Sequence, residues 1–275
     1  AMAAAEVEAS DIDLIIIGTT SPDLIFPNIA TIVQDRLGIS PCPAFSIEAA
    51  CTGFIYALST VDKYIRLGEA KCALVIGAEV LSGLVDWSDR STCVLFGDGA
   101  GAVIVKPADE PGIIATRLGA DGQYRNLLYY PVGPSKDLAK AGLGDSSIKM
   151  SGNEVFKVAV RTLGNVAAET LEANNISHED IDWLIPHQAN LRIIQATAKR
   201  LGLPMEKVIL TVQDHGNTSA ASIPLALSVG KARGQIKPGD LLVTEAIGGG
   251  LAWTTRLPLA NLKPCAFSMI PLRRN

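Results

Sequence analysis

One cysteine of this chain stands where a catalytic nucleophile would be expected. Cys51 follows the apolar segment 42–49, which predicts a buried strand, and precedes the segment 52–67, which predicts a helix. A thiol at a helix N-terminus meets unpaired N–H donors and the positive end of the helix dipole, and both favour the thiolate. A buried structural cysteine is the alternative interpretation. The remaining cysteines are interpreted as structural, most of them in apolar strand patterns: Cys42, Cys72, Cys93 and Cys265.

Two more side chains of catalytic types follow predicted strands later in the chain. His187 comes directly after the apolar segment 181–185, and Asn217 lies at a strand-to-helix junction that corresponds to that of Cys51. Because the carboxyl ends of parallel strands share one edge of a sheet, the three side chains can converge. A cysteine that accepts an acyl group, with His and Asn donors that stabilise a developing oxyanion or enolate, suits this set. A protease-like Cys–His pair remains open.

Glycines and missing motifs narrow the chemistry further. The run Gly-Gly-Gly at 248–250 follows a predicted strand and lets backbone N–H groups approach a substrate closely. The chain has no GxxxxGK[ST] and no GxGxxG that opens a helix, so P-loop or Rossmann nucleotide binding is not expected. No Cys or His pair has ligand spacing, which argues against a zinc site.

The composition fits one large α/β protein. The 275 residues are 48% hydrophobic but only 5% aromatic, which excludes a disordered chain. No apolar run reaches the ~18 residues that span a bilayer, and a net charge of −4 gives no global attraction to nucleic acid or anionic lipid. The five cysteines show neither scaffold density nor CxxC spacing, so we expect reduced thiols in the cytoplasm.

The elements that must position these residues occur twice. The paired segments are 10–16 and 179–185 (strand), 28–39 and 190–203 (helix closed by Gly), 42–49 and 207–214 (strand), 52–67 and 218–233 (helix), 73–80 and 241–248 (strand), and 97–106 and 248–257 (strand). Two copies of alternating strand and helix predict parallel sheets with helices outside.

The two copies are not equivalent at their starts. The second has an extra leading unit, a strand at 113–118, a polar loop at 119–149 and a helix at 153–174. The first begins inside the equivalent helix, so we expect the chain to be incomplete at its N-terminus. The predicted units are an N-terminal half, a C-terminal half and an atypical tail: 1–106, 107–257 and 258–275.

Three motifs carry a resemblance to a known family. They are Ala-Ala-Cys-Thr-Gly-Phe at 49–54, Pro-His-Gln-Ala-Asn-Leu-Arg at 186–192 and His-Gly-Asn-Thr-Ser-Ala-Ala-Ser at 215–222. Further segments agree at 97–102, 152–157 and 245–250. On these motifs the chain resembles β-ketoacyl-acyl-carrier-protein synthase III over nearly its whole length. The resemblance implies a thiolase-like five-layered α-β-α-β-α fold built from two duplicated halves, usually as a homodimer.

The resemblance also implies a decarboxylative Claisen condensation that initiates type II fatty acid synthesis. Cys51 would take an acetyl or other short acyl group from acyl-CoA. His187 and Asn217 would promote decarboxylation of malonyl-acyl-carrier protein and stabilise the enolate, and the N–H groups of Cys51 and Gly249 would form the oxyanion hole. Neither a metal nor a cofactor would be needed.

Positions for substrates and partners follow from the same resemblance. The resemblance implies that coenzyme A and the acyl group are bound by Arg90, Phe156, Ala189, Arg192, Ile247 and Phe26. Of these, Phe26 would cap the acyl pocket of a second copy of the chain. A local basic face can attract the acidic carrier protein despite the negative total charge. Its candidate residues are Lys157, Arg192, Lys199 and Arg200.

Two other functions remain open. A related quinolone-type or polyketide starter synthase would share the chemistry and differ in its acyl group and acceptor, although the segment Gly-Asn-Glu-Val-Phe-Lys at 152–157 favours the fatty acid branch. A non-catalytic truncated form would bind the carrier protein without forming an acyl-enzyme.

Overall fold

A computed structural model describes residues 1–109, 112–133 and 146–258. The predicted tail beyond Pro258, with Cys265, lies outside the described residues, as do residues 134–145 of the predicted polar loop. The division into halves at residue 106 stays a prediction. Each predicted half contributes one four-stranded sheet to the described structure.

The first sheet has the strand order β2-β1-β3-β4. Its strands are β1 (Leu14–Gly18), β2 (Ala44–Ile47), β3 (Ala73–Val80) and β4 (Asp98–Val105). β1 pairs in parallel with β2 and β3, but β4 is antiparallel to β3. The prediction of parallel strands is therefore wrong for β4. Because only the 3₁₀ turn Leu81–Gly83 and irregular turns join β3 to β4, no crossover helix carries the chain back to the other end of the sheet.

The second sheet has the order β5-β10-β9-β8. Its strands are β5 (Ile113–Ala120), β8 (Trp183–Pro186), β9 (Leu242–Gly248) and β10 (Ala252–Pro258). β8 and β9 are parallel, whereas β10 is antiparallel to both β9 and β5, so the parallel prediction is wrong here too. The tight turn after Gly248 returns the chain at once beside β9. A small ribbon of β6 (Leu128–Tyr129) and β7 (Lys149–Met150) stands apart.

The predicted strand at 207–214 is wrong. This segment forms one isolated bridge between Leu184 and Val208 and then the short helix α6 (Val212–His215). The physical reason is a side chain: Gln188 Oε1 accepts the backbone N–H groups of Thr211 and Val212 at 2.9 and 3.1 Å, so these groups do not join a ladder.

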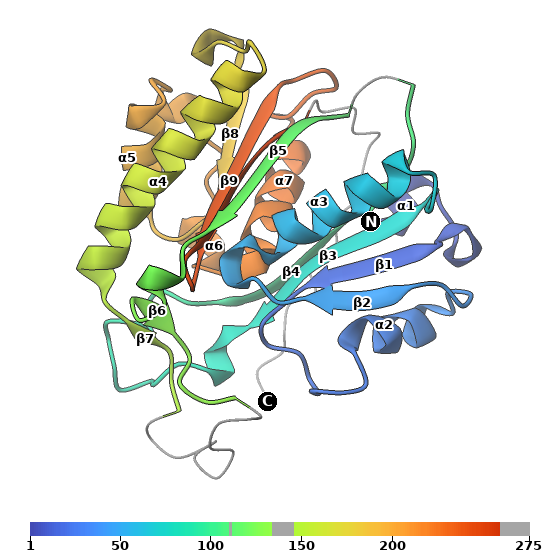
Figure 1. The fold of residues 1–275 in the computed structure, drawn as a ribbon, viewed down its shortest axis with the longest axis horizontal. Coiled ribbons are helices and arrows are strands. Elements are labelled where there is room, and N and C mark those ends of the chain that lie inside the picture. Colours follow the sequence, from blue (N-terminus) through green and yellow to red (C-terminus); the bar gives the residue numbers. More distant parts are fainter. Residues whose placement is uncertain (110–111, 134–145, 259–275) are drawn as a thin grey trace.

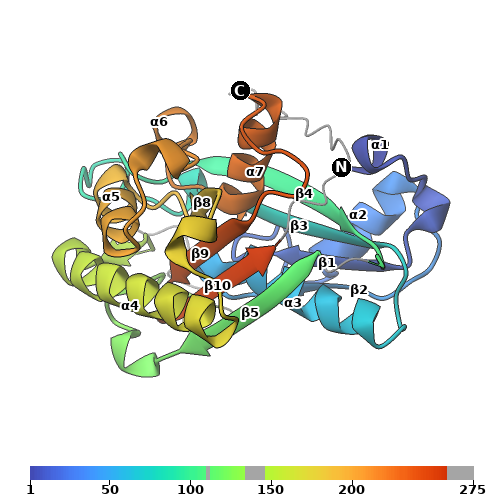
Figure 2. The same cartoon turned by 90° about the horizontal axis from the view of Figure 1, so that it is seen from above.

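The helices and sheets stack in five layers (Figures 1 and 2). The main helices are α1 (Met2–Ala5), α2 (Ile29–Leu37), α3 (Gly53–Arg66), α4 (Gly152–Ala173), α5 (Leu191–Arg200) and α7 (Ser222–Ala232). α1 and α2 cover the outer face of the first sheet, α3 and α7 lie between the sheets, and α4 and α5 cover the outer face of the second. Within the described residues no helix is long and apolar enough to cross a membrane.

Local signals explain where the outer helices begin and end. Asn28 caps α2 by accepting from the Ala30 N–H at 2.9 Å, and Asn190 caps α5 by accepting from the Ile193 N–H at 3.0 Å. The predicted closing glycines Gly38 and Gly202 both have the left-handed conformation that ends a helix, with φ of 65° and 66°.

Missing side chains let the central layer approach the first sheet. A Cβ on Gly77 of β3 would lie 2.3 Å from the carbonyl oxygen of Ala220, just before α7. A Cβ on Gly18 of β1 would lie 2.3 Å from the backbone of Gly53, the first residue of α3. These close approaches hold the N-terminal ends of α3 and α7 against the carboxyl ends of β1 and β3.

We expect Gly77→Ala to lower the free energy of unfolding by about 2 kcal/mol or more, because the new methyl group collides with backbone that cannot move aside. Gly83→Ala is the matched control, since a Cβ there meets nothing within 4 Å, and its effect should stay within about 0.5 kcal/mol. Urea unfolding of both variants checks the difference. Equal losses of stability would show that the close approach does not constrain the fold.

Candidate active site

Cys51 lies in the 3₁₀ turn Ala50–Thr52 that leads into α3, as the strand–cysteine–helix pattern predicts. The turn is strained, because Ala50 has a φ of 47° in the region that favours glycine. Cys51 itself is only 6% exposed. The other described cysteines do not lie between a strand and a helix N-terminus. Cys42 and Cys72 lie just before β2 and β3 of the first sheet. Cys93 lies in a turn, so the prediction that it belongs to a strand is wrong.

The expectation that the helix N-terminus favours the Cys51 thiolate is wrong for the resting protein. Burial raises the pKa of the Cys51 thiol to about 12, and the negative charge of Glu79 acts in the same direction. The neighbouring Ser219 hydroxyl lowers the pKa of the thiol but does not compensate for burial. The resting cysteine is therefore a protonated thiol whose proton must be taken up when it reacts.

His187 directly follows β8 at the carboxyl end of the second sheet. Its backbone N–H donates to the Glu245 carbonyl at 2.7 Å, and its Nδ1 lies 2.7 Å from Ser222 Oγ on the first turn of α7. The ring is only 4% exposed, and burial lowers the pKa of His187 to about 4. The imidazole is neutral at neutral pH and has its Nε2 side available to a substrate.

Asn217 is fixed from both sides of its backbone. Its N–H donates to the Leu95 carbonyl at 2.8 Å, and its carbonyl accepts from the Gly97 N–H at 2.9 Å. The side-chain Oδ1 accepts from the Ser219 N–H at 2.9 Å. Because Oδ1 is occupied, the Nδ2 group is the end of the amide that remains to donate.

The segment 217–222 connects the predicted site residues. It contains Asn217, its Ser219 hydroxyl lowers the pKa of the Cys51 thiol, and its Ser222 hydroxyl is hydrogen-bonded to His187. A Cβ on Gly248, at the end of β9, would lie 2.8 Å from the Cys51 backbone nitrogen, so the glycine run also reaches the cysteine. The structure thus gathers Cys51, His187 and Asn217 at one end of the two sheets, while the pairing of Gly249 in an oxyanion hole stays a prediction.

The predicted acyl-binding residues fall into two groups. Phe156, Ala189 and Ile247 belong to one apolar cluster beside the site, and the Arg192 guanidinium lies over the Phe156 ring at 5.3 Å from its centre. Arg90 and Phe26 are exposed on turns outside this cluster, with Phe26 83% exposed.

The predicted basic face is partly occupied by contacts within the chain. Lys157 pairs with Glu154 at 2.7 Å, and Arg200 donates to Asn165 Oδ1 on α4 at 2.5 Å. Lys199 and Arg192 are exposed on α5. Within the described residues no group of three His, Cys, Asp or Glu side chains could hold a metal ion.

Sequence reasoning missed the residues that hold the site. Ser219 and Ser222 lie inside the motif 215–222 but were not assigned roles. Glu79 is a carboxyl group in the apolar strand 73–80, and a charge at a buried strand position is the signal that could have revealed it. Gln188 adjoins His187, yet nothing in its sequence context distinguishes it from a surface residue.

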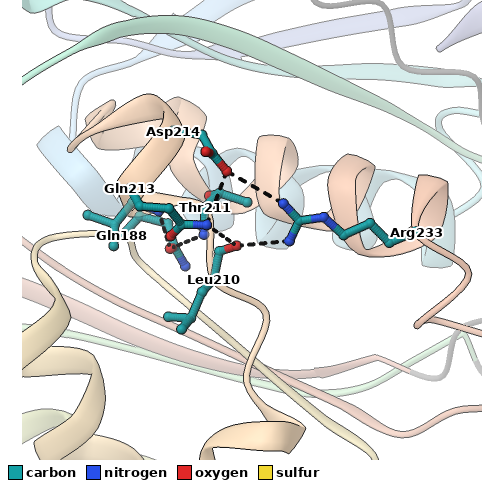
Figure 3. A network of polar contacts seen from close by, with 7 residues as sticks. Gln188, Leu210, Thr211, Gln213, Asp214 and Arg233 are labelled. Carbon is teal, nitrogen blue, oxygen red and sulfur yellow. Dashed lines mark hydrogen bonds and ion pairs between the residues drawn. The ribbon is translucent and has the colours of Figure 1, made fainter.

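Gln188 locks the His187 loop to the segment before Asn217 (Figure 3). Its Nε2 donates to the carbonyls of Pro186 and Ile209, and its Oε1 accepts from Thr211 and Val212. All four hydrogen bonds of the buried amide are therefore made. In the same network Arg233 donates to the Leu210 carbonyl and pairs with Asp214 at 3.5 Å.

Glu245, whose carbonyl holds His187, has a side chain in an unusual state. It is fully buried, both carboxyl oxygens lack a hydrogen-bond partner among the described residues, and burial raises the pKa of Glu245 to about 8. The carboxyl is therefore a neutral acid in the folded protein at neutral pH.

We expect Glu245→Gln to stabilise the protein at pH 8. The unfolded chain ionises this carboxyl near pH 4.5 and the folded chain near pH 8, so the stability it contributes is complete below pH 4.5 and is lost as the pH rises to 8. Gln cannot ionise, and the gain at pH 8 should be on the order of a few kcal/mol. Thermal unfolding at pH 5 and pH 8 measures it, with the exposed Glu172→Gln as control. If the stability difference between Glu245→Gln and the parent is the same at pH 5 and at pH 8, Glu245 is not a buried neutral acid.

Two family models match this chain. The model described as 3-oxoacyl-[acyl-carrier-protein] synthase III matches residues 45–122, and the C-terminal model of the same enzyme matches residues 171–257. A β-ketoacyl-[acyl-carrier-protein] synthase III of Thioalkalivibrio sulfidiphilus is 58% identical over 257 residues, which cover 94% of this chain and 80% of that protein.

Solved structures agree with these sequence matches. The 3-oxoacyl-[acyl-carrier-protein] synthase III of Aquifex aeolicus superposes with a TM-score of 0.88 at 46% identity, covering 94% of this chain and 80% of that one. The priming β-ketosynthase of the R1128 polyketide pathway superposes with a TM-score of 0.90 at 33% identity, covering 96% and 79%.

A five-layered fold defines a condensing acyltransferase of the thiolase fold when a buried cysteine follows a strand of the first sheet, a histidine follows a strand of the second, and an asparagine lies in the segment before the central helix α7. The predicted fold class is confirmed. The chain belongs to the β-ketoacyl-[acyl-carrier-protein] synthase III family.

Proposed function

We propose that the chain joins a short acyl group from acyl-CoA, with acetyl-CoA as the expected primer, to malonyl-acyl-carrier protein. The product is a 3-ketoacyl-acyl-carrier protein, and the reaction begins type II fatty acid synthesis. The observation that carries the proposal is the gathering of Cys51, His187 and Asn217 by the segment 217–222. The names of similar proteins, β-ketoacyl- or 3-oxoacyl-[acyl-carrier-protein] synthase III, support the carrier-bound 3-ketoacyl product.

In the first half-reaction Cys51 is the nucleophile. Its sulfur attacks the thioester carbonyl, the bond to the coenzyme A sulfur breaks, and an acyl thioester remains on Cys51. The backbone N–H groups of Cys51 and Gly249 are the proposed donors to the oxyanion. The space beside Gly248 is too small for a Cβ because the Cys51 nitrogen lies there, which supports the closeness of the two donors.

In the second half-reaction His187 and Asn217 are the donors. Gln188 N–H donates to Ser222 Oγ at 3.4 Å, which directs the Ser222 hydroxyl hydrogen toward His187 Nδ1 and leaves the ring proton on Nε2. The Nε2–H of His187 and the Nδ2 group of Asn217 then stabilise the enolate formed as malonyl loses CO₂. The enolate carbon attacks the acyl-Cys51 carbonyl, and the Cys51 thiolate leaves.

The surroundings supply the proposed binding surfaces. Phe156, Ala189 and Ile247 share one apolar cluster and are the proposed lining of the acyl path. Arg192 and Arg90 are the proposed contacts with coenzyme A and the carrier. The exposed Phe26, with its neighbours Leu24 and Ile25, is the proposed contact with a second copy. The carrier protein docks on the basic face that comprises Lys157, Arg192, Lys199 and Arg200.

We also propose the cytoplasm as the compartment and a reaction without metal or cofactor. The described cysteines Cys42, Cys51, Cys72 and Cys93 are free thiols, which suits a reducing compartment. Loss of CO₂ drives the condensation, so the chemistry requires no redox or metal assistance. Nucleic acid and membranes are not proposed as partners.

A starter synthase of a polyketide pathway is the second candidate. The close superposition with the R1128 priming β-ketosynthase favours it. The two functions share the three catalytic residues and differ in the acyl group and the acceptor.

Incubation with acetyl-CoA and malonyl-acyl-carrier protein tests the proposal, with mass spectrometry of the carrier as the readout. Acetoacetyl-carrier protein and CO₂ are expected, and neither should form when acetyl-CoA is omitted. Replacing acetyl-CoA by longer and branched acyl-CoAs distinguishes the starter synthase. Folded protein that forms no product with any acyl-CoA would contradict both candidates.

A further inference from the structure

A buried carboxyl group stands behind the nucleophile. Glu79 lies near the end of β3 and is only 2% exposed. The loop that follows β1 holds its carboxyl: Ser21 Oγ donates to Oε2 at 2.5 Å, and the Thr20 N–H and hydroxyl donate at 3.1 to 3.2 Å. A carboxyl enclosed so thoroughly by donors can remain in the core as an anion.

One donor to Glu79 comes from the other half of the chain. Ser219 Oγ donates to Glu79 Oε1 at 3.1 Å. The turn Ser219–Ala221 packs against the turn Ala50–Thr52 that carries Cys51, and the Ser219 hydroxyl lowers the pKa of the Cys51 thiol. Cys51, Ser219 and Glu79 therefore form a chain of neighbouring polar groups that leads from the nucleophile into the core.

The backbone of Ser219 is strained to make this contact. Its φ of 49° lies in the left-handed region, which costs a residue with a Cβ about 1 kcal/mol. The conformation aims the Ser219 N–H at Asn217 Oδ1 and its hydroxyl hydrogen at Glu79. Strain of this kind persists where the surroundings require a particular geometry.

We propose that Glu79 takes up and stores the proton of Cys51 during the catalytic cycle, with the Ser219 hydroxyl as the carrier. The S–H bond of Cys51 breaks as an O–H bond forms on Ser219 Oγ. The original Ser219 O–H bond breaks as a bond forms to Glu79 Oε1. Cys51 becomes a thiolate and Glu79 a neutral carboxylic acid, so charge and protons balance.

The stored proton returns in the second half-reaction, and in this respect the inference rests on the proposed function. During acylation the departing coenzyme A thiolate takes its proton from solvent. During condensation the enolate displaces Cys51 as a thiolate, and Glu79 returns the proton to it through Ser219. Glu79 thus acts through Ser219 as a positioning and proton-storing residue and touches no substrate.

Electrostatics fit this role. Burial raises the pKa of Glu79 above its ordinary value, which makes the carboxylate a stronger base. Proton transfer within the chain moves one negative charge by a few ångströms and brings no new charge into the core. Direct loss of the Cys51 proton to solvent would instead leave two buried anions side by side.

Other titratable groups around the chain are occupied or neutral. Asp98 of β4 accepts from Ser82 N–H and Oγ at 2.7 and 2.5 Å, and His187 and Glu245 are uncharged at neutral pH. The pKa of Glu79 is set by burial and by the hydrogen bonds of Ser21, Thr20 and Ser219.

The pH profile of Cys51 reactivity tests the proposal. The probes are acetyl-CoA, followed by intact mass, and iodoacetamide, which alkylates the thiol without a substrate-binding site. In the parent protein both rates should be constant from pH 7 to 9, because Cys51 and Glu79 together hold one proton over this range and no further proton has to leave the protein. In Glu79→Gln we expect rates at least ~10²-fold lower at pH 7 that rise about tenfold per pH unit.

Two serine variants form the matched control. Ser219→Ala and Ser21→Ala each remove one hydroxyl that donates to Glu79, but only the first interrupts the path to Cys51. Ser219→Ala should reproduce the steep profile of Glu79→Gln, and Ser21→Ala should keep the flat one. Glu79→Asp keeps a carboxylate and should restore the flat profile. If Glu79→Gln fails to fold, the comparison of Ser219→Ala with Ser21→Ala still tests the proton path.

Opposite results are equally clear. If Glu79 acts only through its charge, Glu79→Gln lowers the pKa of the Cys51 thiol and speeds alkylation, and this result overturns the proposal. A Cys51 reactivity that does not change with pH in Ser219→Ala overturns it as well. A third outcome separates the two proposals. If the protein is not acetylated, but its alkylation rate is flat with pH in the parent and steep in Glu79→Gln, the proposed function is contradicted and the proton path is supported.

Discussion

Exposure to acetyl-CoA should add one acetyl group to the parent protein and none to Cys51→Ala. Cys51 lies in the turn Ala50–Thr52, next to the Ser219 hydroxyl and the Gly248 backbone. The substitution removes the sulfur that forms the thioester bond, so condensation should fall by at least ~10³-fold. Intact-mass spectrometry reads the adduct, and the product assay reads the turnover.

Cys93→Ala is the control for this experiment, because Cys93 is a free, partly buried thiol on a turn outside the site. It should acquire the acetyl group at the parent rate. An adduct that persists in Cys51→Ala, or that disappears in Cys93→Ala, would assign the nucleophile to a different residue.

Asn217→Asp should stop condensation while acylation continues. Aspartate keeps the oxygen that accepts from the Ser219 N–H, but it replaces the Nδ2 donor by a second oxygen. The enolate then loses a hydrogen bond and meets a negative charge, so condensation should fall by about 10²- to 10⁴-fold. The acetyl adduct on Cys51 should still form, because its oxyanion donors lie elsewhere.

His187→Ala should show the same division between half-reactions, since its Nε2 donor serves only the enolate. His178→Ala, on an exposed 3₁₀ turn, should leave both half-reactions unchanged. The rates of acetyl transfer and of CO₂ release are measured separately. Equal losses in both half-reactions would mean that His187 and Asn217 take part in acylation as well.

Much of the fold could be predicted because its elements are marked locally. The apolar runs 73–80 and 241–248 predict buried strands by composition alone, and Gly38 and Gly202 mark helix ends. The direction of β4 and β10 could not be predicted, because an apolar strand has the same pattern in either direction. The segment 207–214 failed because a single side chain, Gln188, decides its backbone hydrogen bonds.

The site divides in a similar way. Cys51 and His187 could be predicted to lie close together because each follows a strand, and such ends meet at one edge of a sheet. For Asn217 this argument failed, because the predicted strand at 207–214 does not form. The contact of Ser219 with Glu79 joins residues 140 positions apart, and no local pattern reports it. The thiol pKa was predicted with the wrong sign, because a sequence shows the helix that follows but not the depth of burial.

The layer between the two sheets takes one helix from each predicted half, α3 from the first and α7 from the second. Val61 of α3 and Ile223 of α7 pack in one core with Val75 of the first sheet and Leu242 of the second. A half alone would expose that face to water, so the halves are no longer interchangeable modules. A recombination crossover between the halves of related genes therefore succeeds only when both parents carry compatible side chains in this shared layer.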